Sequence, residues 1–348
     1  MLILGIETSC DETSAAVVEE TGDLQRPWAI RSNVVASQVP IHREWGGVVP
    51  ELASRQHIRD ICGVVDRAFE VAGAGWEDLG AVAVTQGPGL VGSLLVGVSF
   101  AKAAASAAGL PLVAVHHLAG HIESLVLENG ELPLPAVVLV VSGGHTNLYL
   151  VEKPGDYRLL SRTRDDAAGE AYDKVAKLLG LGYPGGPPID RLARTGDDRA
   201  IQLPSTRLTH ADRNAPELKG DLDFSFSGLK TAVMRYVRAH ETPLSAQEVA
   251  DVCASFQRTV VNTLISRAID AARRHQARSL GVAGGVSANT RLRAELKVQG
   301  DARELPTFVP SLALSTDNAA MIAAAGLRKY RLGARAAMDL NADAALPL

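Results

Sequence analysis

Four short apolar runs in this chain each end in a turn rich in glycine or hydroxyl residues, and this repeat limits the folds that it can adopt. The turns cover residues 7–14, 85–92, 142–146 and 284–289. Two of them lead into a returning strand and two into a helix, so strands and helices alternate. Such alternation predicts α/β layers with largely parallel sheets, whose ligands bind beyond the carboxyl ends of the strands.

The pattern also suggests an internal duplication. The turns at 7–14 and 142–146 each lie within an expected β-hairpin, about one half-domain apart. Apolar runs predict strands at residues 2–6, 15–18, 82–84, 112–115, 137–141, 147–151 and 280–283. Helical spacing predicts helices ending near residue 108 and at about residues 166–179, 188–195, 227–240, 246–275 and 317–332.

Length and composition bound the class of protein. The 348 residues suffice for two domains, and the net charge of −4 argues against a uniformly basic nucleic-acid-binding protein. Cys10, Cys62 and Cys253 have unrelated spacings, which fits a reducing cytoplasm. Residues 79–101 carry no charge, but glycines and Pro88 interrupt them. We therefore expect a strand, a loop and a helix there, and no membrane span.

Two histidines four residues apart indicate a metal site. His117 and His121, with His116 directly before them, fall in an expected helix, where positions i and i+4 share one face. Asp317 lies just before another expected helix and either caps that helix or supplies a third ligand. Two imidazoles and one carboxylate suit zinc or ferrous iron with positions left open for a substrate oxygen.

The glycine turns also predict an anion site. Freed backbone N–H groups in such turns bind phosphate, and four of them in register favour a nucleotide or another phosphorylated ligand. None of them matches a P-loop or a dinucleotide fingerprint. In the acidic stretch 165–174, Glu170 and Asp173 share a helix face, so one of them is a candidate for holding a ribose hydroxyl; the alternative is favourable charge at a helix start.

The segment 224–230 combines two aromatic rings with small polar residues. Core packing is the simpler role for Phe224 and Phe226. The basic side chains near them are candidates for contacts with an RNA backbone, and they are Lys230, Arg235 and Arg238 together with Arg158, Arg162 and Arg164.

Seven motifs resemble those of one known family. They cover residues 5–13, 46–54, 87–90, 116–121, 141–146, 223–230 and 283–289, and the resemblance extends from Met1 to about Leu332. The chain is identified by them as a member of the tRNA N6-adenosine threonylcarbamoyltransferase family, called TsaD in bacteria and once described as a glycoprotease. The resemblance implies an α/β actin-like ATPase fold, as in sugar kinases and Hsp70 chaperones, with two duplicated lobes and a central ligand cleft. We expect a first lobe at residues 1–117, completed by a C-terminal helix at about 325–348, and a second at 118–324.

The resemblance further implies an activity, a site and partners. The reaction transfers a threonylcarbamoyl group from threonylcarbamoyl-AMP to the N6 amine of the adenosine beside the anticodon, in tRNAs reading codons that begin with A. The expected partners are tRNA, a TsaB-type paralogue, a TsaE-type ATPase and a TsaC-type enzyme that supplies the donor, all in the cytoplasm and without a membrane. By carry-over, His117, His121 and Asp317 hold one Fe²⁺ or Zn²⁺ ion. The expected adenylate contacts are Val140, Val141, Ser142, Gly143, Gly144, Asp173, Gly186, Asp190 and Asn289, and Asp11 or Glu12 is the candidate base.

Three other functions compete with this hypothesis. An ATP-dependent sugar or small-acid kinase of the same fold would share the phosphate turns but would not need the two histidines and Asp317. A zinc peptidase of the H-E-x-x-H type would carry its glutamate directly after His117, where this chain has Leu118. The third alternative is a non-catalytic binding module that responds to nucleotide.

Overall fold

The computed structural model describes residues 1–206, 208, 218 and 220–348. They form two compact units. The first unit comprises Met1–Leu132, Lys153–Tyr157 and Pro310–Leu348, and the second comprises Pro133–Glu152 and Arg158–Val309. The expected lobe boundaries at residues 117 and 324 differ from these bounds. Helix α4 (His117–Asn129) stays with the first unit because it packs against α11 (Ala319–Arg331).

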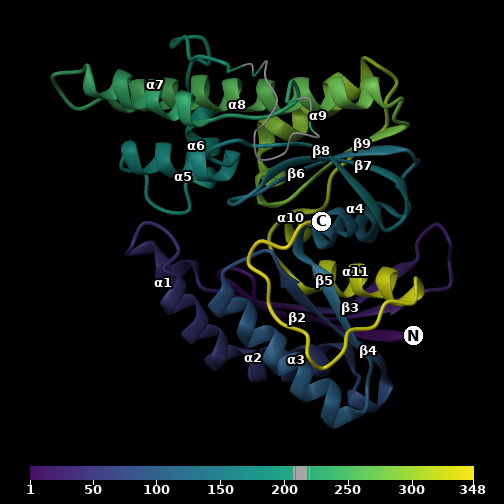
Figure 1. The fold of residues 1–348 in the computed structure, drawn as a ribbon. Helices are drawn as coiled ribbons and strands as arrows, with labels where there is room; N and C mark the ends of the chain where they lie inside the picture. The colour runs from purple at the N-terminus through teal and green to yellow at the C-terminus, as the bar shows by residue number, and fades with distance from the viewer. Residues whose placement is uncertain (207, 209–217, 219) are drawn as a thin grey trace. The chain divides into compact units, whose positions relative to one another are not determined.

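The first unit contains a five-stranded sheet in the order β3-β2-β1-β4-β5 (Figure 1). Its strands β1, β2 and β3 are antiparallel neighbours, whereas β1, β4 and β5 run parallel. The predicted hairpin is therefore confirmed. Strand β3 was not predicted, because polar and partly exposed residues are frequent in it. The strands are β1 (Leu2–Glu7), β2 (Glu12–Glu20), β3 (Trp28–Ser37), β4 (Leu79–Gly87) and β5 (Leu112–His116).

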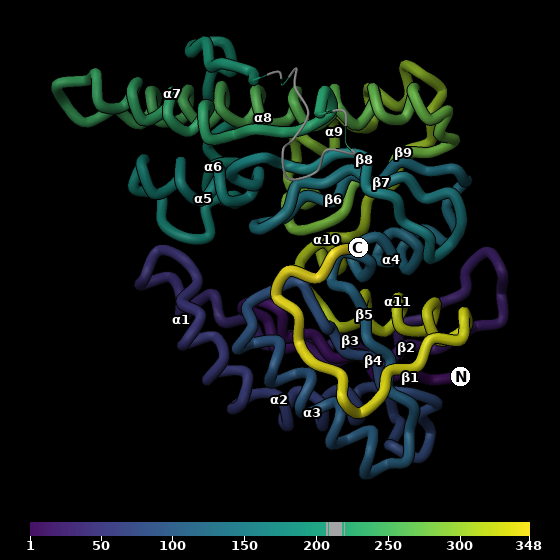
Figure 2. Tube along the Cα trace, in the orientation of Figure 1, coloured from purple at the N-terminus to yellow at the C-terminus, as the bar shows by residue number. Residues whose placement is uncertain are grey.

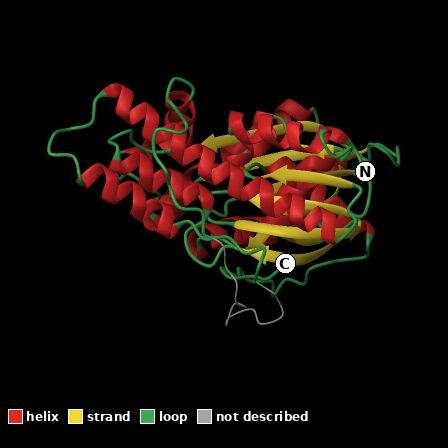
Figure 3. Ribbon diagram, turned by 90° about the horizontal axis from the view of Figure 1, so that it is seen from above, coloured by secondary structure: helices red, strands yellow, loops and turns green. Residues whose placement is uncertain are grey.

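Helices cover both faces of this sheet, as the labels in Figure 1 show, and Figure 3 gives a second view of the helices and strands. Leu4 and Ile6 of β1 belong to the core formed with α2 (Pro50–Ala72) and α3 (Val91–Ala108). Ile3 belongs to the opposite core, against α11. Gly5 faces the same way as Ile3, and a Cβ there would overlap the backbone carbonyl of Ala319. Glycine at this position therefore lets α11 lie close to the sheet.

The second unit repeats the strand order of the first. Its sheet runs β8-β7-β6-β9-β10, with β6 antiparallel to β7 and parallel to β9, and β9 parallel to β10. Because two sheets share this order and these directions, the structure supports the predicted duplication. The strands are β6 (Ala136–Val141), β7 (Thr146–Lys153), β8 (Asp156–Arg162), β9 (Ser279–Ala283) and β10 (Thr307–Phe308).

The helices of the second unit share one core with β6 and β7. Val137, Leu139 and Val141 all point from β6 into this core. Ser245 caps the longest helix through a capping box with Glu248, which explains why that helix begins at the predicted residue. The helices are α5 (Ala168–Leu178), α6 (Gly186–Ala193), α7 (Ser227–Arg238), α8 (Ala246–Arg274) and α9 (Thr290–Asp301).

The uncharged segment 79–101 forms a strand, a loop and the start of a helix, as predicted. Within the described part of the chain, α3 is the one helix whose length and apolar composition would allow it to cross a membrane. In the structure it packs on α2 and β4. It therefore contributes to the core of the first unit.

The last residues, 333–348, run past the ends of β4 and β5 as an extended tail (Figure 2). Ala336 donates its N–H to the Leu112 carbonyl at 2.7 Å, and Asp343 donates to the Gln86 carbonyl at 2.9 Å. The imidazole of His116 contacts the Leu346 carbonyl at 2.9 Å. The C-terminal helix expected at about residues 325–348 is therefore wrong over most of its length, because α11 ends at Arg331 and the residues after it are extended or in turns. Two short helices, α1 (Val39–Arg43) and α10 (Leu312–Ser315), complete the first unit.

Candidate metal centre

The two predicted histidines lie on one face of α4, as their spacing required. His117 is the first residue of the helix and His121 lies one turn later. Their ring centroids are 4.7 Å apart and the rings meet edge to face. His116 caps this helix, because its Nδ1 accepts the backbone N–H of Leu118 at 3.1 Å.

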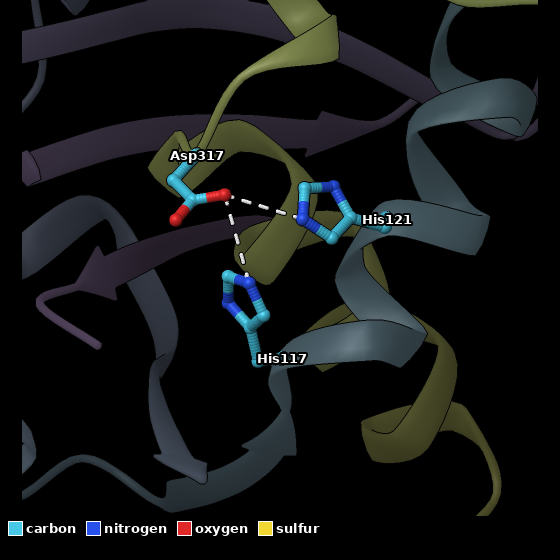
Figure 4. A group of neighbouring side chains, drawn as sticks. All are labelled: His117, His121 and Asp317. Carbon is cyan, nitrogen blue, oxygen red and sulfur yellow. Dashed lines mark ion pairs between the residues drawn. The ribbon is translucent and has the colours of Figure 1, made fainter. Parts of the chain in front are cut away.

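Asp317 closes the cluster from the segment just before α11 (Figure 4). Its Oδ1 lies 3.2 Å from Nε2 of His121 and 3.6 Å from Nε2 of His117. All three candidate ligand atoms lie within 4.8 Å of one another. The His121 side chain is 0% exposed whereas that of Asp317 is 20% exposed, so the cluster has one accessible side. This set can bind a divalent ion and leave coordination positions free.

A glycine between the histidines allows α4 and α11 to approach. A Cβ on Gly120 would lie 2.8 Å from Cδ1 of Ile322 and 3.1 Å from Cγ of Met321, both on α11. The shorter of these distances is below any ordinary Cβ contact, so a side chain at Gly120 would force Ile322 or the helices to shift. The absence of a side chain at Gly120 therefore helps to bring His121 within reach of Asp317.

Asn318, and not Asp317, caps α11. Its Oδ1 accepts the N–H of Met321 at 3.1 Å, and two strands fix the next backbone groups. Ser14 of β2 accepts the N–H of Ala319 at 2.9 Å, and Asn33 of β3 accepts that of Ala320 at 3.3 Å. Of the two roles considered for Asp317, helix capping is thus wrong, and its carboxylate faces the histidines.

Glu7, which the sequence analysis did not single out, supports His117 from behind. Its Oε2 lies 3.1 Å from Nδ1 of His117 and accepts the hydroxyl of Thr85 at 2.7 Å. Ser9 places its Oγ 3.2 Å from the same Nδ1. A carboxylate on the far nitrogen fixes the tautomer that leaves Nε2 available to a metal. The sequence signal that could have indicated this role is an acidic residue at the end of a buried strand.

Neighbouring charge and burial shift the pKa of His117 in opposite directions. Burial alone would lower the pKa of His117, but the carboxylates of Asp317 and Glu7 raise it to about 9. Burial lowers the pKa of His121. Neither buried ring nitrogen of His121 makes a hydrogen bond of good geometry with the described residues, although Oδ1 of Asp317 lies 3.2 Å from Nε2. A buried, unpaired polar atom is costly, so coordination of Nε2 fits this cluster well.

His116, the third histidine of the motif, serves the fold instead. Burial lowers its pKa to about 4, with the nearby charge of His117 acting in the same direction and the Leu346 hydrogen bond against it. The ring is therefore neutral, with Nδ1 accepting from Leu118 and Nε2 donating to Leu346. It links the start of α4 to the C-terminal tail.

The candidate base residues lie in the turn between β1 and β2. Asp11 is buried, and Glu12 begins β2. Burial raises the pKa of Glu12 well above its usual range, and the neighbouring charges of Asp11 and Asp317 add to the effect. The electrostatic influence of Asp317 couples Glu12 to the candidate metal cluster.

In the second unit, the predicted adenylate contacts begin at the end of β6. Val140 and Val141 are fully buried, so only their backbone groups can meet a ligand. Ser142 closes the following turn by accepting the N–H of His145 at 3.2 Å. Gly143 and Gly144 both border open space, since no atom lies within 4 Å of the position that a Cβ would take.

The remaining predicted adenylate contacts fall into two groups. Asp173 on α5 accepts the N–H of Gly185 at 2.7 Å and so fixes the turn before Gly186, which borders open space. Asp190 on α6 and Asn289 before α9 meet through Gln257 of α8. The Gln257 amide donates to Asp190 at 3.1 Å and accepts from Asn289 at 2.7 Å.

Comparison with known proteins identifies the family. Residues 29–324 match the family model described as TsaD, tRNA N6-adenosine threonylcarbamoyltransferase. The chain belongs to this family. It is 54% identical to the tRNA N6-adenosine threonylcarbamoyltransferase of Anaeromyxobacter dehalogenans (strain 2CP-C), covering 99% of this chain and 98% of the relative. The enzyme of that name from Geobacillus kaustophilus is 50% identical, covering 99% and 96%. The predicted family and the transferase class are confirmed.

Solved structures show the same fold at low sequence identity. Full-length HypF, in its phosphate- and nucleotide-bound form, superposes with a TM-score of 0.57 at 13% identity, over 95% of this chain and 46% of that one. The activator of the 2-hydroxyisocaproyl-CoA dehydratase from Clostridium difficile gives 0.51 at 13%, over 96% and 97%. Both have the actin-like ATPase fold, so the fold class expected for this TsaD family member is confirmed.

Some basic residues considered for RNA contact have partners within the chain. Arg164 binds Asp223 at 2.8 Å, and Lys230 binds Asp166 at 3.0 Å. Phe224 and Phe226 stack on each other in the core, as the simpler hypothesis held. This family motif therefore joins the start of α7 to the loop after β8.

Proposed function

We propose that this chain transfers the threonylcarbamoyl group of threonylcarbamoyl-AMP to the N6 amine of the adenosine beside the anticodon in tRNA, assisted by one metal ion. The observation that carries the proposal is the cluster of His117, His121 and Asp317 in a chain whose relatives bear this name. Kinases of the same fold have no need for such a cluster.

The metal-binding role falls to Nε2 of each histidine and to the Asp317 carboxylate. Glu7 would orient His117 for this task through Nδ1. A bound Fe²⁺ or Zn²⁺ ion supplies a Lewis acid that draws electron density from donor oxygens. The partial exposure of Asp317 supports access for the donor.

In the second unit, the glycine turns would hold the adenylate. Gly143, Gly144 and Gly186 leave space for a phosphate or sugar to approach the main chain. Backbone N–H groups in such turns stabilise the negative charge that develops on the leaving phosphate. Asp173, Asp190 and Asn289, together with the backbone of Val140, Val141 and Ser142, complete the proposed contacts.

The acyl transfer requires one proton acceptor. The adenosine N6 forms a bond to the carbamoyl carbon, the bond from that carbon to the phosphate oxygen breaks, and AMP leaves with the electron pair. The proton lost by N6 passes to a carboxylate, which we assign to Glu12 or Asp11. Burial raises the pKa of Glu12, which makes its ionised carboxylate a stronger proton acceptor and supports this role.

We infer a cytoplasmic enzyme that works with other proteins. A TsaC-type enzyme would supply the donor, and a TsaB-type paralogue and a TsaE-type ATPase would assist turnover. Family membership supports these partners. We also propose that the two compact units correspond to the two lobes of the fold family, with the C-terminal segment completing the first.

Mass spectrometry of tRNA nucleosides tests the activity. Substrate tRNA is incubated with threonine, bicarbonate, ATP and the companion proteins, with and without this chain. We expect the threonylcarbamoyl adenosine only when the chain is present, and its loss with His121→Ala. His240→Ala, at the end of α7, is the matched control and should keep activity. ATP-dependent phosphorylation of a sugar that survives His121→Ala would contradict the proposal, as would nucleotide binding without modified tRNA.

A further inference from the structure

Three buried side chains form a hydrogen-bonded chain that ends at the turn carrying Asp11 and Glu12. They are Gln38, His42 and His57, all in the first unit and each 0–1% exposed. They are not ligands of the candidate metal centre. The chain runs from the segment after α1 to the carbonyl of Cys10.

At the end of this hydrogen-bonded series that is farther from Asp11, the contact with Val49 fixes which atoms donate. The backbone N–H of Val49 donates to Nδ1 of His42 at 3.3 Å, so the proton of the neutral ring sits on Nε2. That Nε2 donates to Oε1 of Gln38 at 3.2 Å. Nε2 of Gln38 then donates to the Ala53 carbonyl at 3.4 Å, and its second N–H makes a longer contact of 3.3 Å with Nδ1 of His57, whose one lone pair it shares with a closer donor.

The near end of the chain agrees with this direction. A carbonyl oxygen can only accept, so His57 donates from Nε2 to Cys10 at 3.0 Å. Its Nδ1 therefore accepts, and the hydroxyl of Thr13 donates to it at 2.8 Å. Both ends thus assign the same tautomer to His57.

The ring of His57 consequently bridges the two residues that flank Asp11 and Glu12. It holds the carbonyl of Cys10 on one side and the hydroxyl of Thr13 on the other. The backbone N–H of Gln38 adds a third link, to the Asp11 carbonyl at 2.9 Å. With the backbone fixed on both sides, the two carboxylates start from a restricted set of positions.

We propose that His57 is a positioning residue for the carboxylates of Asp11 and Glu12, and that Gln38 and His42 fix its tautomer. It acts through the turn and does not touch the substrate. The proposal rests on the assignment of Asp11 or Glu12 as proton acceptor. If His57 served only the fold, replacing it would lower stability and leave kcat of the folded enzyme unchanged. If it positions the carboxylates, replacing it lowers kcat of the folded enzyme.

Two variants separate these roles in the full chain with its companion proteins. His57→Leu removes the ring's hydrogen-bond contacts with Cys10, Thr13 and Gln38, and His57→Gln keeps one donor and one acceptor. We expect His57→Leu to lower kcat by about 10- to 100-fold, with bound metal and the KM for tRNA unchanged. His57→Gln should restore kcat to within about threefold of wild type. An unchanged kcat for His57→Leu, or equal losses in both variants, would overturn the proposal.

Asp11→Asn and Glu12→Gln separate this proposal from the function on which it rests. If neither variant lowers kcat, the assigned proton acceptor is wrong. If one of them does and His57→Leu does not, the positioning role alone is wrong.

A spectroscopic measurement covers the case in which His57→Leu does not fold. The ¹⁵N chemical shifts of labelled histidines in the wild-type chain, assigned with His57→Gln, report the ring tautomer. We expect a neutral His57 protonated on Nε2 at neutral pH. Protonation on Nδ1, or a charged ring, would contradict the donor and acceptor roles assigned to these hydrogen bonds, and with them the proposal.

Discussion

At the scale of single residues, the carboxylate of Glu7 determines which ring nitrogen of His117 faces Asp317. Glu7 occupies Nδ1, so Nε2 is the nitrogen that faces Asp317. Thr85 and Ser9 in turn hold Glu7 through its two oxygens. Such a supporting carboxylate increases the basicity of a histidine ligand and restricts its rotation. The metal affinity of the cluster should therefore depend on a residue that does not touch the ion.

Glu7→Gln tests this dependence. The amide preserves the size of the side chain and removes its charge, so we expect zinc affinity to fall by about 10- to 100-fold. Isothermal titration of the metal-free protein measures the change. Glu128→Gln is the matched control, since Glu128 on the same helix as His117 accepts from the Ser311 N–H and lies outside the cluster. Equal affinities for wild type and Glu7→Gln would show that Glu7 has no such role.

At the scale of elements, the site depends on how closely α4 packs on α11. Gly120 lies at their contact, and Gly5 and Gly326 allow α11 to approach β1 and β4, respectively. Side chains at these positions would overlap neighbouring atoms. The approach of α11 is what carries Asp317 to the histidines.

Gly120→Ala should separate the two helices. Overpacking of this kind costs about 1–3 kcal/mol of unfolding free energy, and we also expect weaker metal binding. Ile322→Val removes the Cδ1 that the new methyl group would meet, so the double variant should recover part of both losses. Urea denaturation and metal titration measure the two effects.

Gly63→Ala provides the control for this cycle. Gly63 lies within α2, and a Cβ there meets no atom within 4 Å. Alanine should stabilise this helix by up to about 1 kcal/mol. A Gly120→Ala variant that behaves like Gly63→Ala would contradict the packing explanation.

At the scale of the whole molecule, the sequence predicted what depends on local pattern. The hairpin of β1 and β2 and the helix of His117 follow from periodicity and turn residues, and the duplication was inferred from two similar turns, whereas the strand order came from the structure. Helix α2 was missed although its buried residues, such as His57, Ile61 and Val65, recur at helical spacing.

The metal-supporting role of Glu7 was missed because it depends on His117, which is distant in the sequence. The cap of α11 is a local bond from Met321 to Asn318, so that role was open to sequence reasoning. The path of the C-terminal tail, in contrast, depends on distant contacts such as that of His116 with the Leu346 carbonyl.

Removal of residues 334–348 should loosen the first unit. The deletion takes away the partners of Leu112, Gln86 and His116, with each lost hydrogen bond contributing about 1 kcal/mol. Hydrogen–deuterium exchange should therefore rise in β5 and at the start of α4. The strands β6 and β9 serve as the internal control. An unchanged exchange rate in β5, or an equal rise in β6 and β9, would contradict this role of the tail.

The central claim is that His117, His121 and Asp317 bind one divalent ion. Anomalous X-ray diffraction at the zinc or iron absorption edge, from crystals of the metal-loaded chain, tests it most directly. We predict a single peak about 2.0–2.2 Å from Nε2 of both histidines and from an oxygen of Asp317. A map without a peak among these three side chains, or with the metal bound elsewhere, would contradict the account.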